Sequence, residues 1–263
     1  MPTPASTTLL ARLEADDLAR NAANQRSYPR APAGADASRS DLRVGPSSLG
    51  PHAGLGLFAG ASPIVAKSRI SQYRGALLPP DDLALQTSYT MTADGFAVDG
   101  DPSLPVADGI AQRANDAGCM SAAEFTTPVA ELVAAYMRDA RKCNVVTLSE
   151  GGGVLVLVAV RDIAPHEELY HFYGAEYWLG KLRAAAAATG RHERCAEIDA
   201  ARSEYLRTVE GGRPQRAPAA DGAARGRVLS SDQDSGTVKY EFAGQGSCWI
   251  WREQLREMLK NPG

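Results

Sequence analysis

Cysteine and aromatic residues are scarce in this sequence of 263 residues, and it has no excess of positive charge. It has four cysteines, and no two of them form a CxxC pair, so we predict neither a disulfide framework nor a structural zinc site. His192 and Cys195 stand three residues apart, but no second pair of metal ligands lies near them in the sequence, and no metal is expected. Because the formal net charge is −3 and no run of Lys or Arg occurs, we do not expect direct binding to nucleic acid.

Long hydrophobic runs are also missing. The longest aliphatic run, residues 154–160, is far shorter than the ~20 residues of a transmembrane helix. The first residues lack the basic start and the apolar core of a secretory signal. We therefore expect a soluble protein of the nucleus or cytoplasm, with reduced thiols and no membrane partner.

The sequence does contain enough apolar residues for a folded core, with 44% hydrophobic and 22% charged residues. Leucines at helical spacing predict an amphipathic helix over residues 7–22, and the Ala-, Arg-, Pro- and Ser-rich residues 23–40 predict a linker or loosely ordered arm. From residue 41 onward, short β-type segments are separated by Gly, Pro and Asp. We expect strands at residues 42–44, 56–58, 69–73, 89–91, 96–98, 144–148 and 154–160.

Helical patterns interrupt and follow these strands. One helix begins near Thr127, with Pro128 in its first turn, and two more are expected over residues 175–188 and 191–209. Because the strands do not alternate with helices, the order of elements predicts a β-rich α+β fold rather than a doubly wound sheet. We divide the chain into an N-terminal helix and linker (1–40), a main domain (41–178) with a helical insertion (119–142), a helical region (179–210), a linker (211–225) and a small β-rich module (226–263).

The C-terminal module is expected to hold three short strands and a helix over residues 252–259. Trp249 and Trp251 share one face of its last strand, because side chains alternate along a strand. They form either the core of a tiny barrel or a partly exposed aromatic binding surface.

Four segments carry residues suited to binding a ligand. They are Gly54-Leu55-Gly56, Tyr73 before Gly75, Asn115-Asp116, and Glu168 followed by Tyr173-Gly174. Glycine lets the backbone come close to a ligand, and Asn supplies both a donor and an acceptor. Each segment alone is compatible with an ordinary turn or strand end. The last segment is the most specific, because five aromatic residues fall between Tyr170 and Trp178 in a chain that has few.

Together and in this order, the four segments resemble the SET-domain protein lysine methyltransferases, over about residues 44–178. The resemblance implies a SET-type fold of small curled β-sheets with flanking helices, a chain crossing that joins the third and fourth segments, and S-adenosylmethionine as cofactor. By position it makes Gly54, Leu55, Gly56, Asn115, Asp116 and Tyr173 cofactor-binding residues. It makes Tyr173 and Tyr73 catalytic residues that line the channel for the lysine.

Several other residues receive roles from the same resemblance. Glu168 orders the crossing, Trp178 packs either against the adenine or in the core, and His171 stands two residues before the catalytic tyrosine, at a position that tunes the number of methyl groups. The sequence departs from the family pattern at Asp116, where the family has histidine, and at Ala117-Gly118, where it has Ser-Cys. The cysteine cluster that follows the domain in many histone-directed members is absent, so any lid over the cofactor must come from the helices after Trp178.

Such a site suits methyl transfer to a lysine amine. The amine must be neutral to attack, and an apolar channel walled by Tyr73 and Tyr173 lowers its pKa from about 10.4. We therefore expect methylation of a lysine in a protein or peptide substrate, with histone and hence chromatin as one candidate. Two alternatives stay open. One is a catalytically weak SET domain that acts as an interaction module, with Trp249 and Trp251 contacting its partner, and the other is an unrelated small β protein.

Overall fold

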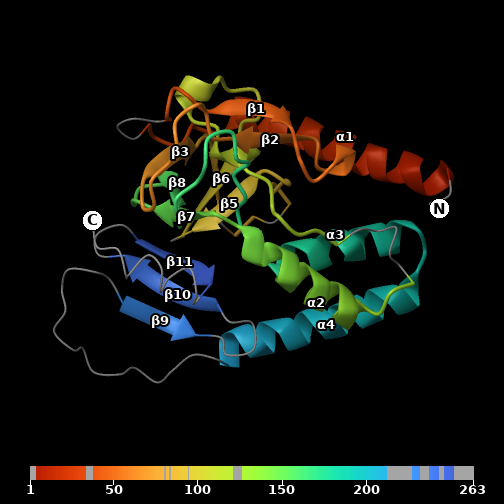
Figure 1. The fold of residues 1–263 in the computed structure, drawn as a ribbon. Helices are drawn as coiled ribbons and strands as arrows, with labels where there is room; N and C mark the ends of the chain where they lie inside the picture. Colours follow the sequence, from red (N-terminus) through yellow and green to blue (C-terminus); the bar gives the residue numbers. More distant parts are fainter. Residues whose placement is uncertain are drawn as a thin grey trace.

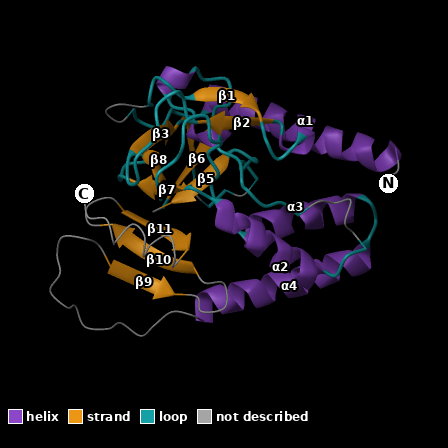
Figure 2. Ribbon diagram, in the orientation of Figure 1, coloured by secondary structure: helices purple, strands orange, loops and turns teal. Residues whose placement is uncertain are grey.

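The computed structural model describes residues 4–33, 38–79, 81–82, 84–93, 95–120, 126–211, 227–231, 237–242 and 246–251. Within these ranges the chain forms four α-helices and eleven strands (Figures 1 and 2). The sheets of the first eight strands lie together, and helix α1 (Pro4–Ser27) packs against them with its C-terminal half and projects beyond them. Helices α2 (Val129–Asp139), α3 (Ala175–Ala188) and α4 (His192–Gly211) pack together beside these sheets. The predicted α+β class with small sheets and flanking helices is confirmed.

The sheets are small and antiparallel. In the first sheet, strand β1 (Arg43–Pro46) pairs with β2 (Leu55–Phe58). In the second, β8 (Leu155–Ala159) lies between β3 (Arg69–Tyr73) and β7 (Val145–Ser149). In the third, β6 (Phe96–Gly100) lies between β4 (Gly75–Leu78) and β5 (Thr90–Ala93). The strands β9 (Arg227–Ser231), β10 (Thr237–Phe242) and β11 (Gly246–Trp251) form a fourth sheet at the C-terminal end, with β11 beside β7. The first three sheets enclose one apolar core that includes Leu57, Ile70, Leu155, Leu157 and Leu169.

Sequence analysis missed β4. This strand is only four residues long, starts at a glycine and is followed by two prolines, so it lacks a strand signature of its own. Gly75 makes the corner between β3 and β4 possible, because a Cβ there would lie 1.9 Å from the carbonyl oxygen of Asp99. The chain can therefore turn sharply against β6 at this position.

The segment predicted as a linker or loosely ordered arm is instead part of the fold where it is described. Residues 23–27 belong to α1, and the chain then runs beside β3 and β4, where Ala31 N donates to Gly75 O (2.8 Å) and Arg39 N donates to Ile70 O (2.9 Å). Ala31 is 1% exposed. Composition alone misjudged this segment because its order comes from hydrogen bonds to strands that lie far away in the sequence.

Where its side chains are described, helix α1 is held to the sheets by polar groups, and Leu18 is the one leucine of the predicted stripe that lies in this part. Asn21 and Asn24 are both 3% exposed, whereas Leu18 is 48% exposed. Asn21 Nδ2 donates to Gly100 O (2.9 Å), and Asn24 Nδ2 donates to Leu85 O and to Asp99 Oδ2 (both 2.8 Å). Buried amides need partners, and the C-terminal end of β6 and the loop before β5 supply them.

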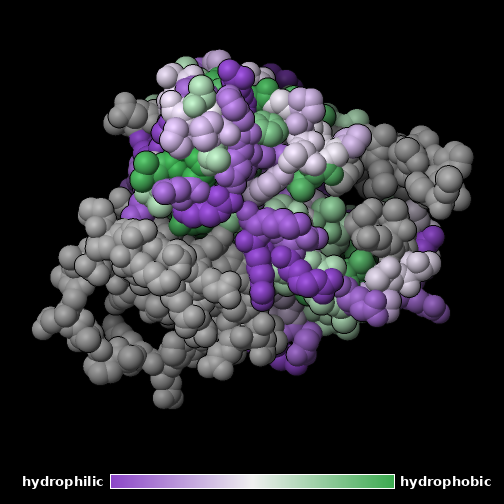
Figure 3. All heavy atoms as spheres, in the orientation of Figure 1, coloured by the Kyte–Doolittle hydropathy of each residue, from purple (hydrophilic) through white to green (hydrophobic). Residues whose placement is uncertain are grey.

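Helices α2, α3 and α4 share a second apolar core, to which Leu132, Tyr136, Leu179, Leu182 and Ile198 contribute. The opposite face of α2 is polar, and the side chains over α2 are mostly hydrophilic on the face shown in Figure 3. The helix begins at Val129 rather than at a Thr127 cap, and its first N–H donates to Glu197 Oε1 of α4 (2.8 Å). The insertion is thus tied to the helices that follow the main domain.

Some predictions concern residues outside the described ranges or are not tested by the fold. The helix over 252–259 and the linker that follows α4 lie outside the described residues, and so do the side chains of Trp249 and Trp251. The division into domains stays a prediction. Among the described helices, none is both long and apolar enough to cross a membrane.

Candidate active site

The third and fourth segments of the sequence pattern meet in a chain crossing. Residues 168–173 pass between Asn115 on one side and the start of β7 on the other, with parallel bridges from Asn115 to Tyr170 and from Val145 to His171. His171 N donates to Asn115 O (2.7 Å), and the Asn144 side chain bonds the backbone on both sides of Leu169. This crossing brings Tyr173 to Asn115 and Asp116, although more than 50 residues separate Tyr173 from these two in the sequence.

Glu168 fastens the crossing to the loop that follows β1. Its carboxylate accepts hydrogen bonds from Ser47 Oγ (2.7 Å), from the N–H and Oγ of Ser48 (2.7 and 2.6 Å) and from Tyr170 Oη (2.9 Å). Although burial raises the pKa of Glu168, the bonds from Ser48 and Ser47 outweigh it, and the pKa lies below its ordinary value. Glu168 is therefore an ionised structural anchor, in agreement with the role expected for it.

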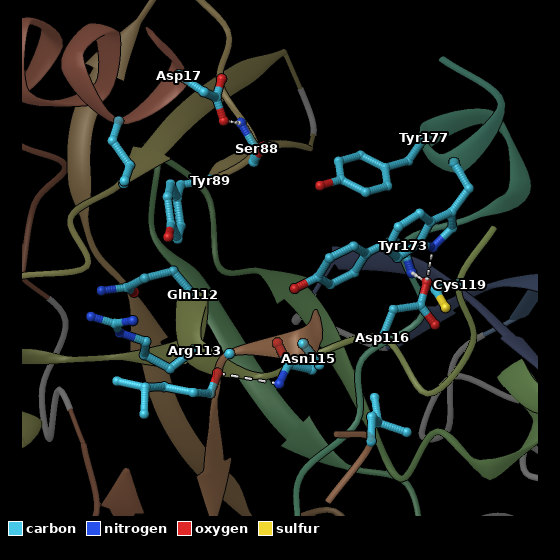
Figure 4. Close-up of a pocket in the computed structure, with 16 residues that line it drawn as sticks. Asp17, Ser88, Tyr89, Gln112, Arg113, Asn115, Asp116, Cys119, Tyr173 and Tyr177 are labelled. Carbon is cyan, nitrogen blue, oxygen red and sulfur yellow. Dashed lines mark hydrogen bonds between the residues drawn. The ribbon is translucent and has the colours of Figure 1, made fainter. Parts of the chain in front are cut away.

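A cavity of about 400 Å³ opens beside this crossing (Figure 4). Its wall is built by α1, the loop before β2, the loop before β5, residues 112–119 and the start of α3. The described residues that line it are Asp17, Leu18, Leu49, Ala53, Gly54, Leu55, Ser88, Tyr89, Gln112, Arg113, Asn115, Asp116, Cys119, Tyr173, Tyr177 and Trp178.

Five of the seven residues singled out from the sequence lie on this wall. They come from three separate segments: Gly54 and Leu55, then Asn115 and Asp116, and finally Tyr173. Trp178, for which the sequence left two roles open, lines the cavity and also packs against the helical core, and its contact with the adenine stays a prediction. The structure therefore joins most of the predicted site in one place.

Gly56 and Tyr73 are not among the described residues that line the cavity. Gly56 is buried and faces the carboxylate of Glu168. Tyr73 is 6% exposed and stands behind the wall, where its hydroxyl donates to Tyr89 O (2.5 Å). Both residues support the wall, and their assigned contacts with cofactor and substrate stay predictions.

Aromatic rings form much of the wall. Tyr89 faces Tyr173 and Tyr177 across the cavity (Figure 4). The ring of Tyr173 packs edge-on against Tyr177 (centroids 5.1 Å apart) and parallel to Trp178 (6.5 Å, 10° between planes). Such packing holds the three rings in fixed orientations.

Tyr73, Tyr173 and Tyr177 are neutral phenols at physiological pH. Burial, together with nearby Tyr73 and Tyr177, raises the pKa of Tyr173 well above its ordinary value. Burial also raises the pKa of Tyr177 to about 12, and it raises that of Tyr73 as well. The Tyr173 hydroxyl donates to Ala114 O (2.7 Å), which leaves its oxygen turned to accept a further hydrogen bond.

Asp116 is the most connected polar group of the site. Its Oδ2 accepts from Tyr136 Oη (2.6 Å), Trp178 Nε1 (2.9 Å) and Tyr173 N (3.0 Å). Burial raises the pKa of Asp116 to about 6 in spite of these bonds. The residue that departs from the family pattern is thus the point at which Tyr173 and Trp178 are attached.

Sequence reasoning missed Asp17, Tyr89, Gln112, Arg113 and Tyr177 as wall residues. Tyr177 lies inside the aromatic-rich stretch, so the density of rings was a usable signal. Asp17 had no local signal, because it reaches the cavity only through the docking of α1, where its Oδ2 accepts from Ser88 N (2.9 Å). Among the described residues, no three His, Cys, Asp or Glu side chains cluster closely enough to hold a metal ion.

Comparisons with known proteins give little more. No family model and no curated protein matches the sequence. Among solved structures, a candidate histone methyltransferase of Plasmodium falciparum is similar at a TM-score of 0.32 and 17% identity, over 53% of this chain and 98% of that one. The methyltransferase domain of human PR domain-containing protein 2 is similar at 0.32 and 16%, over 59% and 84% of the two chains. Neither likeness bears on the chemistry of the cavity, which is inferred below from its residues.

Proposed function

We propose that this protein is a SET-type methyltransferase that moves a methyl group from S-adenosylmethionine to a lysine amine of a protein substrate, with histone as one candidate. One observation carries the proposal. Gly54, Leu55, Asn115, Asp116 and Tyr173, picked from three separate sequence segments, converge on one cavity. Segments that matched the family pattern by chance would have no reason to meet there.

The cavity suits a cofactor of this chemistry. Its volume of about 400 Å³ falls in the range of about 300–1,000 Å³ that is usual for small-molecule sites. S-adenosylmethionine carries a sulfonium, an ammonium and a carboxylate. The sulfonium and the ammonium are cations, and they would be attracted by the aromatic rings of the wall and by the carboxylates of Asp17 and Asp116. The carboxylate of the cofactor is an anion, and Arg113 could pair with it.

Different residues of the cavity wall would bind different parts of S-adenosylmethionine. The backbone at Gly54 and Leu55 and the side chain of Asn115 would bind the amino-acid part, and the face of Trp178 would stack on the adenine. When bound, the cofactor supplies an electron-poor methyl group on sulfur. The protein has to align that group with an incoming amine and exclude water, and such positioning can contribute roughly 7–11 kcal/mol.

Tyr173 is the residue that we assign to orienting the amine. As a neutral phenol it is not a base, because its pKa is raised well above the ordinary value by burial. Its oxygen can accept a hydrogen bond from the amine, while its own proton goes to Ala114 O. Tyr73 supports this wall through its hydrogen bond to Tyr89 O. The aromatic surroundings lower the pKa of the lysine, so its proton leaves to water before transfer.

A second function is favoured by the same rings. Four aromatic side chains with two carboxylates also suit an alkylated ammonium group, such as a methylated lysine, bound without turnover. The protein would then be an interaction module that recognises a modified peptide.

A transfer assay separates these functions. Protein is incubated with S-adenosylmethionine and either core histones or a total protein extract, and methyl-lysine is identified by mass spectrometry. We expect transfer by the wild type, a loss of roughly 100-fold or more for Tyr173→Phe, and unchanged activity for Tyr28→Phe, which changes a tyrosine in another apolar cluster.

Ligand binding is measured in parallel with the transfer assay, so that a lack of activity can be explained. Binding of S-adenosylhomocysteine should persist in Tyr173→Phe. Wild-type protein that binds a trimethyl-lysine peptide but transfers no methyl group would support the interaction module. Full activity of Tyr173→Phe would contradict the role of Tyr173.

A further inference from the structure

The helical insertion reaches into the site through one side chain. Tyr136 of α2 is 1% exposed, and it is among the largest fully buried side chains of the molecule. Its ring stacks on Phe172 (centroids 5.9 Å apart, 24° between planes), directly beside Tyr173 in the sequence. Packing alone would need only a phenylalanine here, so the hydroxyl calls for its own explanation.

The Tyr136 hydroxyl joins the two halves of the chain crossing. It donates to Asp116 Oδ2 (2.6 Å), and it accepts from the N–H of Gly174 (2.9 Å). Asp116 belongs to the segment before the insertion, whereas Gly174 directly follows Tyr173. One oxygen atom from α2 thus bridges the third and fourth segments of the sequence pattern.

The carboxylate oxygen that Tyr136 contacts also sets the cavity wall. Asp116 Oδ2 accepts from the backbone N–H of Tyr173 (3.0 Å) and from the indole N–H of Trp178 (2.9 Å). A displaced Asp116 would therefore shift both rings. Asp116 itself is 4% exposed, so it can find no replacement donor in water.

We propose that Tyr136 is a positioning residue of this site: its hydroxyl holds Asp116 and Gly174 together and thereby sets Tyr173 and Trp178 in the wall of the cavity. The effect on ligands rests on the proposed function, whereas the hydrogen-bond network does not. Helix α2 of the insertion then positions residues of the site, in addition to packing against the other helices.

The network can be followed through the titration of Asp116. Cys119 shares the cavity wall with Asp116. Among the described residues, four further titratable groups interact with Asp116 electrostatically: Tyr136 of α2, Cys143 before β7, Tyr173, and Tyr177 of α3. Burial keeps all four neutral near pH 6. Burial also places the pKa of Asp116 at about 6, within the range in which the protein can be studied.

The indole N–H of Trp178 reports that titration by NMR without any ligand. The chain has three tryptophans, so ¹⁵N-tryptophan labelling gives three indole signals, and Trp178→Phe identifies the relevant one. We expect this signal to titrate with a midpoint near pH 6 in the wild type. Asp116→Asn should abolish the titration.

Tyr136→Phe keeps the ring and removes one hydrogen bond to the carboxylate. Because that bond favours the ionised form, its loss should raise the midpoint by roughly one unit or more. Leu132→Val, which trims the same helix and the same core without touching Asp116, should leave the midpoint unchanged. In the same set, Tyr136→Phe should weaken binding of S-adenosylhomocysteine by about 5- to 10-fold.

Three results would overturn the proposal: no titration of Trp178 in the wild type, a titration that persists in Asp116→Asn, or an equal midpoint in Tyr136→Phe and the wild type. The first two remain decisive even if Tyr136→Phe does not fold. Failure of the wild type to bind S-adenosylhomocysteine would instead count against the proposed function and leave the titration as the test of the network.

Discussion

The carboxylate of Glu168 lies so close to Gly56 that a Cβ added to Gly56 would stand 2.1 Å from Oε1. Glycine at this position lets the anchor of the crossing reach its serine partners beside β2. The contact with Glu168 thus accounts for the second glycine of the GxG turn, and the contact of Gly56 with the cofactor stays a prediction.

Gly56→Ala should therefore push Glu168 away from its donors. We expect the free energy of unfolding to fall by about 1–3 kcal/mol, as measured by urea unfolding. Gly45→Ala is the matched control, because Gly45 pairs with Gly56 across the two-stranded sheet and its added Cβ would find its nearest neighbour at 3.8 Å. Equal effects of the two substitutions would contradict this account of Gly56.

Glu168→Gln tests the charge of the same anchor. The variant should be less stable than the wild type by about 1–2 kcal/mol at pH 7, since hydrogen bonds to a carboxylate are stronger than those to an amide. The folded pKa of Glu168 lies below its ordinary value of 4.5, so this contribution is present above pH 4.5 and is lost as the pH falls through the folded value. Urea unfolding at pH 7 and pH 3 should show the difference between the two proteins shrinking, and a constant difference would speak against an ionised anchor.

Asn24→Ala should loosen α1. The substitution removes the donor to Leu85 O and Asp99 Oδ2 and leaves Asp99 buried with fewer partners, so we expect a loss of about 1–3 kcal/mol. Hydrogen exchange should become faster throughout α1. Arg26→Ala, which changes an exposed residue of the same helix, is the control and should change neither quantity. Unchanged exchange in Asn24→Ala would show that something else holds the helix.

His171 predicts a separate dependence on pH. Burial lowers its pKa to about 4, and within the described part of the chain its Nδ1 has no hydrogen-bond partner. Because the folded value lies below the ordinary 6.5, the neutral ring stabilises the fold above pH 6.5, and this stabilisation is lost as the pH falls through 4.

Between pH 6.5 and 4, the wild type should therefore lose up to about 3 kcal/mol more stability than His171→Leu. His192→Gln, which changes an exposed histidine, should follow the wild type. Chemical unfolding across this pH range measures the difference. Parallel curves for the wild type and His171→Leu would mean that His171 does not titrate as a buried group.

Local sequence was informative where the candidate site residues stand in short segments. Gly54-Leu55, Asn115-Asp116 and Tyr173 each stand within a pattern a few residues long, and all five line the cavity. The strands were found where alternation or β-branched residues were dense, as in β3 and β8.

The features that could not be predicted from the sequence depend on contacts between distant segments. Asp17 reaches the cavity because Asn21 and Asn24 hold α1 against β6. No spacing of residues in the sequence predicts these hydrogen bonds. Tyr73 fits the family pattern as a wall residue, yet its side chain stands behind Tyr89, which no pattern singled out. The bond from Tyr136 to Asp116 spans an insertion that the family pattern does not cover.

The proposed function depends on binding of S-adenosylmethionine in this cavity, and a thiol on the cavity wall can report that binding. Cys119 is exposed and lines the cavity, Cys143 is buried, and Cys195 lies on α4 outside the wall. Alkylation rates measured by peptide mass spectrometry, with and without saturating S-adenosylhomocysteine, compare Cys119 in one sample with Cys195, whose exposure is intermediate. We predict that the ligand slows alkylation of Cys119 severalfold and leaves Cys195 unaffected. An unchanged rate at Cys119, at a ligand concentration that calorimetry shows to be saturating, would place the ligand elsewhere, and the absence of any saturable binding would contradict the proposed function outright.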